Sequence, residues 1–80
     1  MTLDDIKEKI SSGFEKAEIN LTGDGCNCSA TVISDEFLNM SLLQRQRKVL
    51  HTVKEEIASG ELHALSVKTY TLKEKSELKS

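Results

Sequence analysis

The chain of 80 residues contains no proline and no tryptophan, and only four glycines. It has no internal repeat and no linker segment, so we expect one domain spanning residues 1–80. No apolar run approaches the ~18 residues of a membrane span. The acidic start, residues 2–5, also lacks the basic and then apolar pattern of a signal peptide. We therefore expect a cytoplasmic protein that does not enter the membrane.

The chain also lacks the motifs of the common enzyme and nucleic-acid-binding classes. It has no Gly-x-Ser-x-Gly, no phosphate-binding glycine loop and no acid–base constellation, so we expect no catalysis. The Gly-x-x-Gly loop by which KH domains clamp nucleic acid is missing, and no strand carries an aromatic pair for stacking bases. With 11 basic and 13 acidic residues, the net charge is −2. This charge argues against a generally basic nucleic-acid binder and leaves a local basic patch open.

Hydrophobic spacing predicts the elements of the first half. Apolar residues recur at helical spacing over residues 3–12. Strand-like alternation over residues 17–22 and 28–33 flanks the turn signal Gly23-Asp24-Gly25, which predicts an antiparallel hairpin. Residues 35–40 break this pattern and should form a loop or a short helical turn.

The second half predicts one long helix and one strand. Ser41 and Gln44 form a capping-box signal, after which helical spacing continues without a break to Gly60. Residues 63–70 alternate as a third strand, and a helical crossover permits parallel pairing with the second strand. The order helix-strand-strand-helix-strand predicts an α+β domain with a three-stranded mixed sheet. We expect residues 72–80 to form a charged tail with little core and poor order.

Cysteine is scarce, and its two occurrences differ in setting. Cys26 and Cys28 could close only a tight, strained ring with each other, so free thiols, redox groups or ligands are expected in a reducing compartment. By strand parity Cys28 points the same way as Ala30 and Val32, which favours a small buried side chain. Cys26 lies on the turn and should be more exposed, as an incidental surface thiol or as a ligand.

His63 stands at the start of the third strand. Its parity matches Leu65 and Val67, which favours a partly buried imidazole bonded to backbone. The alternative is a ligand at the sheet edge, because a thiolate and a neutral imidazole together suit zinc or the iron of an iron–sulfur cluster. Two ligands do not complete a tetrahedral site, so a partner would have to supply the rest. His51 lies mid-helix among charged residues and is interpreted as a solvated position.

The start of the long helix is basic. Arg45, Arg47 and Lys48 could touch phosphate there. A mixed, solvated charged face explains the same residues equally well, because the cluster is small.

Two stretches of the chain resemble the BolA-like family. They are FLNMSLLQRQRKV at residues 37–49 and LHALSVKTYT at residues 62–71. Their most specific parts are the Ser-x-x-x-Arg-x-Arg helix start and the His-Ala-Leu-Ser segment. The segment LTGDG at residues 21–25 also resembles the hairpin of short bacterial members. The resemblance covers nearly the whole chain and implies a class II KH-like α+β fold without the nucleic-acid clamp.

The same resemblance implies a partner. BolA-like proteins share a [2Fe–2S] cluster with a monothiol glutaredoxin and its glutathione, and the isolated chain would hold no cluster and be a monomer. The family's strand histidine and its hairpin histidine or cysteine match His63 and Cys26. The family is also described as DNA-binding, which implies a transcriptional regulator acting through Arg45, Arg47 and Lys48 as the alternative. A third possibility is a monomer in which the thiols and imidazoles are inert.

The chain departs from the family pattern at a few positions. Asn39 replaces a glycine, and Gln46 replaces a histidine between two arginines. Leu72 and Lys75 replace the proline and tryptophan of a C-terminal Thr-Pro-x-x-Trp motif, which puts a contact of the tail in doubt. None of these changes falls on a candidate ligand.

Overall fold

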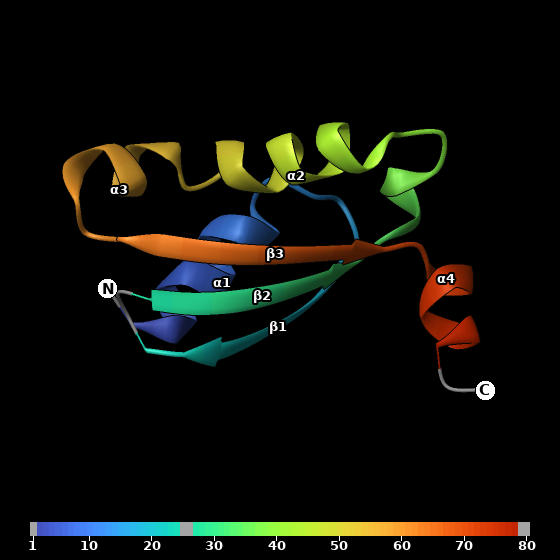
Figure 1. The fold of residues 1–80 in the computed structure, drawn as a ribbon, viewed down its shortest axis with the longest axis horizontal. Coiled ribbons are helices and arrows are strands. Elements are labelled where there is room, and N and C mark those ends of the chain that lie inside the picture. The colour runs from blue at the N-terminus through green and yellow to red at the C-terminus, as the bar shows by residue number, and fades with distance from the viewer. Residues whose placement is uncertain (1, 25–26, 79–80) are drawn as a thin grey trace.

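The computed structural model describes residues 2–24 and 27–78 (Figure 1). Along the chain its elements are α1 (Leu3–Ser11), β1 (Glu18–Gly23), β2 (Asn27–Ile33), the 3₁₀-helix η1 (Asp35–Phe37), α2 (Leu42–His51), α3 (Lys54–Ser59), β3 (Ala64–Tyr70) and α4 (Leu72–Glu77). The α+β class and the short helical turn after β2 are confirmed. Within the described residues, no helix is long and apolar enough to cross a membrane.

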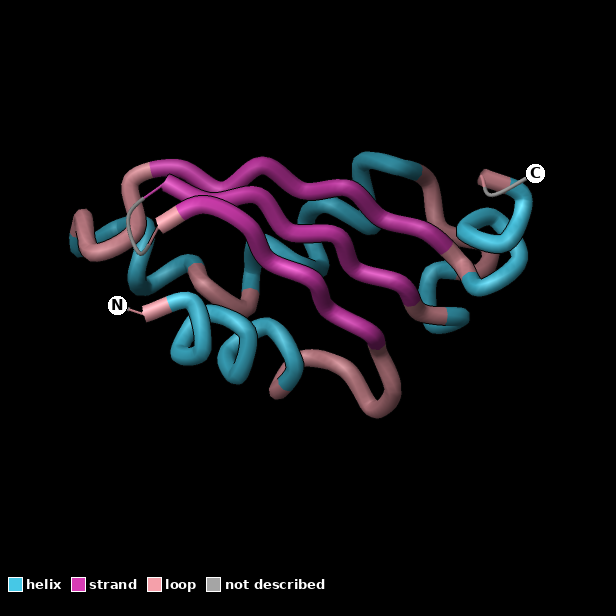
Figure 2. The backbone as a smooth tube through the Cα atoms, turned by 90° about the horizontal axis from the view of Figure 1, so that it is seen from below, coloured by secondary structure: helices cyan, strands magenta, loops and turns pink. Residues whose placement is uncertain are grey.

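The three strands form one mixed sheet in the order β1-β2-β3. The hairpin strands β1 and β2 are antiparallel, and β3 lies parallel to β2 after the helical crossover, as expected. Figure 2 shows the strands side by side as one layer, and residues of α1 and α2 share one core with the inward-facing residues of the sheet. The opposite face of the sheet is polar and carries exposed residues such as Asn20, Ser29 and Lys68.

The core lies between the sheet and these helices. It is lined by Ile6, Ile10, Ile19, Cys28, Ala30, Val32, Phe37, Val49, Val53 and Leu62. Only three residues are aromatic, and two of them meet here: the rings of Phe14 and Phe37 pack edge to face with centroids 5.4 Å apart. Such pairs are favoured by the ring quadrupoles. Phe37 is fully buried and sits at the centre of this packing.

The expected long helix is broken into α2 and α3, so that prediction was wrong. At the break the Thr52 hydroxyl donates to the Val49 carbonyl at 2.6 Å. The Thr52 amide donates to the same carbonyl, which is the i−3 rather than the i−4 residue. A side chain that bonds its own helix backbone competes with the regular helix. Val53 leaves helical geometry, with φ −120° and ψ 18°, and its side chain is fully buried in the core.

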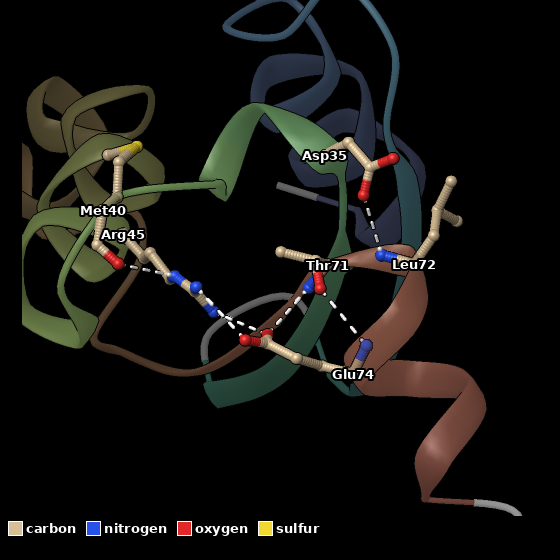
Figure 3. Close-up of polar contacts among 6 residues, drawn as sticks. All are labelled: Asp35, Met40, Arg45, Thr71, Leu72 and Glu74. Atoms are coloured by element: carbon tan, nitrogen blue, oxygen red, sulfur yellow. Dashed lines mark hydrogen bonds and ion pairs between the residues drawn. The ribbon is translucent and has the colours of Figure 1, made fainter.

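The charged tail also differs from expectation, because residues 72–77 form helix α4. Thr71 caps it in a capping box with Glu74, and the Thr-x-x-Glu spacing that signals this cap is present in the sequence. Arg45 holds the helix in place by a two-pronged ion pair, with Nη1 to Oε1 of Glu74 at 2.7 Å and Nη2 to Oε2 at 3.3 Å (Figure 3). Arg45 Nε donates to the Met40 carbonyl at 3.1 Å, which fixes the guanidinium.

Leu72 and Lys75, the two residues of α4 that depart from the family pattern, each contact a residue outside the helix. The backbone N–H of Leu72, which a proline would lack, donates to Oδ1 of Asp35 at 3.1 Å (Figure 3). The ammonium of Lys75 lies 5.9 Å from the centre of the Tyr70 ring, in cation–π range. The tail therefore contacts η1 through Leu72 and β3 through Lys75.

Docking of α4 should weaken in acid. The hydrogen bonds from the Arg45 side chain, and then from the Thr71 backbone, lower the pKa of Glu74 below its ordinary value. Because the folded pKa lies below the unfolded one, this contribution is present above the unfolded pKa and is lost as pH falls through the folded value. We expect an NMR titration to show Glu74 protonating below its ordinary pKa, with the amide shifts of residues 72–77 changing together. Glu74→Gln should remove that step, and a Glu74 pKa at or above the ordinary value would contradict the assignment.

Candidate functional site

The parallel strands β2 and β3 begin side by side. Their first residues, Asn27 and Ala64, are register partners. His63 immediately precedes β3 and is exposed. The expectation that its imidazole lies on the buried side was wrong, because the strand starts one residue later and parity does not extend to His63. Leu62 is buried there instead, and its N–H donates to the Glu56 carbonyl at 3.1 Å.

The hairpin at the same end of the sheet is closed by reciprocal bonds. The amide of Asp24 donates to the Asn27 carbonyl at 3.0 Å, and the amide of Asn27 donates to Oδ1 of Asp24 at 2.7 Å. Gly23 enters the turn with φ +110°, a conformation that favours glycine. The candidate ligand Cys26 lies outside the described residues. Asp24 and Asn27, the described residues on either side of positions 25 and 26, are therefore held together at the start of β2.

Cys28 has the role that its parity predicted. It is buried in the core, and its thiol is free. Burial, and then the nearby Asp24 carboxylate, raise the pKa of this thiol. A buried thiol with a raised pKa is a poor nucleophile and a poor ligand. Because Cys28 is buried, Cys26 is the better candidate ligand of the two cysteines.

The inertness of Cys28 can be measured directly. In a Cys26→Ser variant, Cys28 is the remaining cysteine, since the chain has two. We expect it to react with a thiol reagent at least about tenfold more slowly in the native protein than after denaturation, because reaction requires local opening of the sheet. Equal rates before and after denaturation would show that the thiol is accessible.

The described residues do not form a complete metal site. Among residues 2–24 and 27–78, no group of three or more histidine, cysteine or acidic side chains could hold an ion. His63 can contribute one exposed imidazole, and a site at this edge needs further ligands. His51 is exposed on α2, as predicted for a solvated position.

The basic residues of α2 are not gathered on one exposed face. Arg45 is 8% exposed, and its guanidinium forms an ion pair with the Glu74 carboxylate. Lys48 is half-buried, with its ammonium 4.9 Å from the centre of the Phe14 ring. Of the three cations proposed to contact phosphate, Arg47 alone is exposed. Phosphate binding by all three would require the ion pair with Glu74 to break.

Comparison with known proteins gives consistent matches. The family model for "BolA-like protein" matches residues 11–74, which include all three strands and His63. A protein of Buchnera aphidicola subsp. Baizongia pistaciae is 35% identical over 69 residues, covering 86% of this chain and 87% of the relative. The acid stress protein IbaG of Escherichia coli strain K12 is 28% identical over 71 residues, covering 89% and 84%. A BolA protein homologue from Coxiella burnetii superposes with a TM-score of 0.83 at 34% identity, covering 95% of this chain and 97% of that one.

Proposed function

Because the chain belongs to the BolA-like protein family, we propose that it is a non-enzymatic partner of a monothiol glutaredoxin. The two proteins would share a [2Fe–2S] cluster in iron–sulfur cluster trafficking or iron homeostasis, in the cytoplasm. The glutaredoxin and its glutathione would supply thiolates, and Cys26 and His63 would hold one iron. The name of the Escherichia coli relative connects that protein with acid stress, and we extend the proposal to a role under stress.

The observation that supports this proposal most is the register at the start of the parallel strands. Asn27, which follows Cys26 in sequence, is the partner of Ala64, which follows His63. Hydrogen bonds between these strands and within the hairpin hold both neighbours in place. The two candidate ligands are thus each one peptide bond from a fixed pair of residues.

The donor chemistry at this edge fits half of a cluster site. The exposed His63 can bind iron through a ring nitrogen without disturbing the core. No other cysteine competes, since Cys28 is buried. A cluster bound by imidazole as well as thiolate has a higher reduction potential than one bound by thiolates alone. Such a cluster would suit sensing or transfer rather than permanent storage.

The proposal is tested by purifying the protein with a monothiol glutaredoxin and glutathione under anaerobic conditions. Visible absorption and circular dichroism then report the ligands of the cluster. We expect His63→Ala and Cys26→Ser each to change the visible dichroism and to reduce the cluster retained by the pair. Unchanged spectra in both variants would reject this ligand assignment.

The chain offers a matched control for each ligand. His51→Ala removes the other imidazole, which is exposed on α2, and Cys28→Ala removes the other thiol, which is buried. Both controls should keep the wild-type spectrum. Far-ultraviolet dichroism of each variant separates loss of a ligand from loss of the fold.

A further inference from the structure

A shallow groove lies on the surface of α2 and α3, across the bend between them. In Figure 1 the two helices appear as separate segments above β3, joined by a short non-helical connection. The groove at this elbow has a volume of about 430 Å³ and is lined by Arg47, Leu50, His51, Lys54, Ile57 and Ala58.

Basic side chains surround this groove without a partner of their own. Within residues 2–24 and 27–78, neither Arg47 nor Lys54 makes an ion pair, and the His51 side chain makes no hydrogen bond. By contrast, Arg45 pairs with Glu74, and Lys48 lies over an aromatic ring. Among the described residues, Glu55 and Glu56 line the adjoining depression beside His51 and Lys54, and no acidic residue lines the groove itself. Its positive charge is therefore available to a ligand.

The rest of the groove is apolar. Leu50 is half-buried, Ile57 is 39% exposed, and Ala58 is exposed. These three residues form a small apolar surface between the cations. Charge at the rim favours rapid and selective association, while the apolar centre supplies most of the affinity.

We propose that the elbow groove, formed by Arg47, Leu50, His51, Lys54, Ile57 and Ala58, binds an acidic amphipathic segment of a partner protein. Carboxylates of the segment pair with Arg47 and Lys54, and an apolar side chain packs on Leu50 and Ile57. Phosphate groups alone would use the cations and leave the apolar centre uncovered, and the groove holds no aromatic ring for a base. The groove thus suits an acidic peptide better than a nucleic acid.

This inference does not depend on the cluster proposal. The candidate ligands Cys26 and His63 precede β2 and β3 in the sequence, whereas the groove lies on α2 and α3. The groove variants described below leave His63 and both cysteines unchanged. Failure of peptide binding would leave the cluster spectra as they are, and failure of the cluster proposal would leave peptide binding testable.

A random peptide library displayed on phage is the probe for this surface. The full-length protein is immobilised, and phage that also bind an Arg47→Glu/Lys54→Glu double variant are removed first. We expect the remaining peptides to be rich in aspartate and glutamate with apolar residues between them. Fluorescence anisotropy of one such peptide should show binding at least about tenfold weaker to the double variant, and weaker binding as salt is added.

Controls separate the groove from general charge. Lys68→Glu reverses an exposed charge on the open face of the sheet and should leave peptide affinity unchanged. Ile57→Ser removes apolar surface without changing charge and should also weaken binding. Selection of no acidic peptide, or equal loss in Lys68→Glu, would overturn the inference. Tight binding of duplex DNA that is lost in the double variant, without peptide binding, would overturn it in favour of nucleic acid, and self-association through the groove in sedimentation would overturn it in favour of a second copy.

Discussion

Replacing Phe37 by alanine is expected to lower the free energy of unfolding by about 3–5 kcal/mol, the cost of removing a buried phenyl ring and leaving a cavity. The ring is fully buried and meets the Phe14 ring at 5.4 Å. The Arg45 guanidinium also lies 5.7 Å from the centre of the Phe37 ring. Removing the ring therefore also removes a contact of the arginine that pairs with Glu74 in α4. Small domains are stable by only ~5–15 kcal/mol. Phe37→Ala should therefore remove a large fraction of the free energy of unfolding.

Urea denaturation followed by circular dichroism measures this effect. Phe37→Leu is the matched control, because it keeps an apolar side chain in the same place and should cost less than the alanine variant. Phe14→Ala should also cost less, since Phe14 is half-buried rather than fully buried. If Phe37→Ala and Phe14→Ala proved equally destabilising, Phe37 would not be the centre of the core.

Gly23→Ala is expected to destabilise the protein by about 2–4 kcal/mol, as the sum of a left-handed backbone and a steric clash. Gly23 has φ +110°. An added Cβ would lie 2.5 Å from the Asn27 carbonyl oxygen and 2.9 Å from the Cα of Cys28, and both of these are backbone atoms that cannot turn aside. The clash falls at the start of β2, so we also expect weaker pairing of Asn27 with Ala64 and reduced cluster retention in the glutaredoxin pair.

A second glycine provides the control. Gly60 ends α3 with φ +87°, and an added Cβ there would meet nothing within 4 Å. Gly60→Ala should therefore cost only about 1 kcal/mol, the left-handed strain alone. The difference between the two variants in urea denaturation isolates the steric contribution. Equal costs would show that the close approach at Gly23 relaxes without loss.

Local sequence signals predicted the elements of this fold well where neighbouring residues determine the backbone conformation. The capping boxes at Thr2 and Ser41 begin α1 and α2 as expected. Alternation over β1 and β2 placed Cys28 in the core correctly. Asn39, at the family's glycine position, has φ +66°, a conformation that asparagine tolerates better than most residues. The helix caps and the positive φ of Asn39 depend on residues that are close in sequence, so they can be predicted from the sequence.

The errors occurred where residues far apart in sequence meet. Helical spacing runs without interruption through Thr52, yet the chain bends there so that Val53 enters the core. Gly13 approaches the Thr52 side chain so closely that a Cβ on residue 13 would collide with it. Parity assigned His63 to the buried side, but β3 begins only where Ala64 pairs with Asn27. No local pattern reports a contact of this kind.

By itself, the sequence determined the fold class, the strand pairing and the burial of Cys28, whereas Cys26 and His63 as cluster ligands stay a prediction that rests on the family resemblance. Only the tertiary structure decided that His63 is exposed, that α2 and α3 form a groove, and that α4 is docked through Arg45 and Glu74, 29 positions apart. Periodicity and caps act within a few residues and can be read along the chain. Packing and ion pairs join residues that are near one another only after folding, and these contacts determine which surfaces face solvent and are available to a partner.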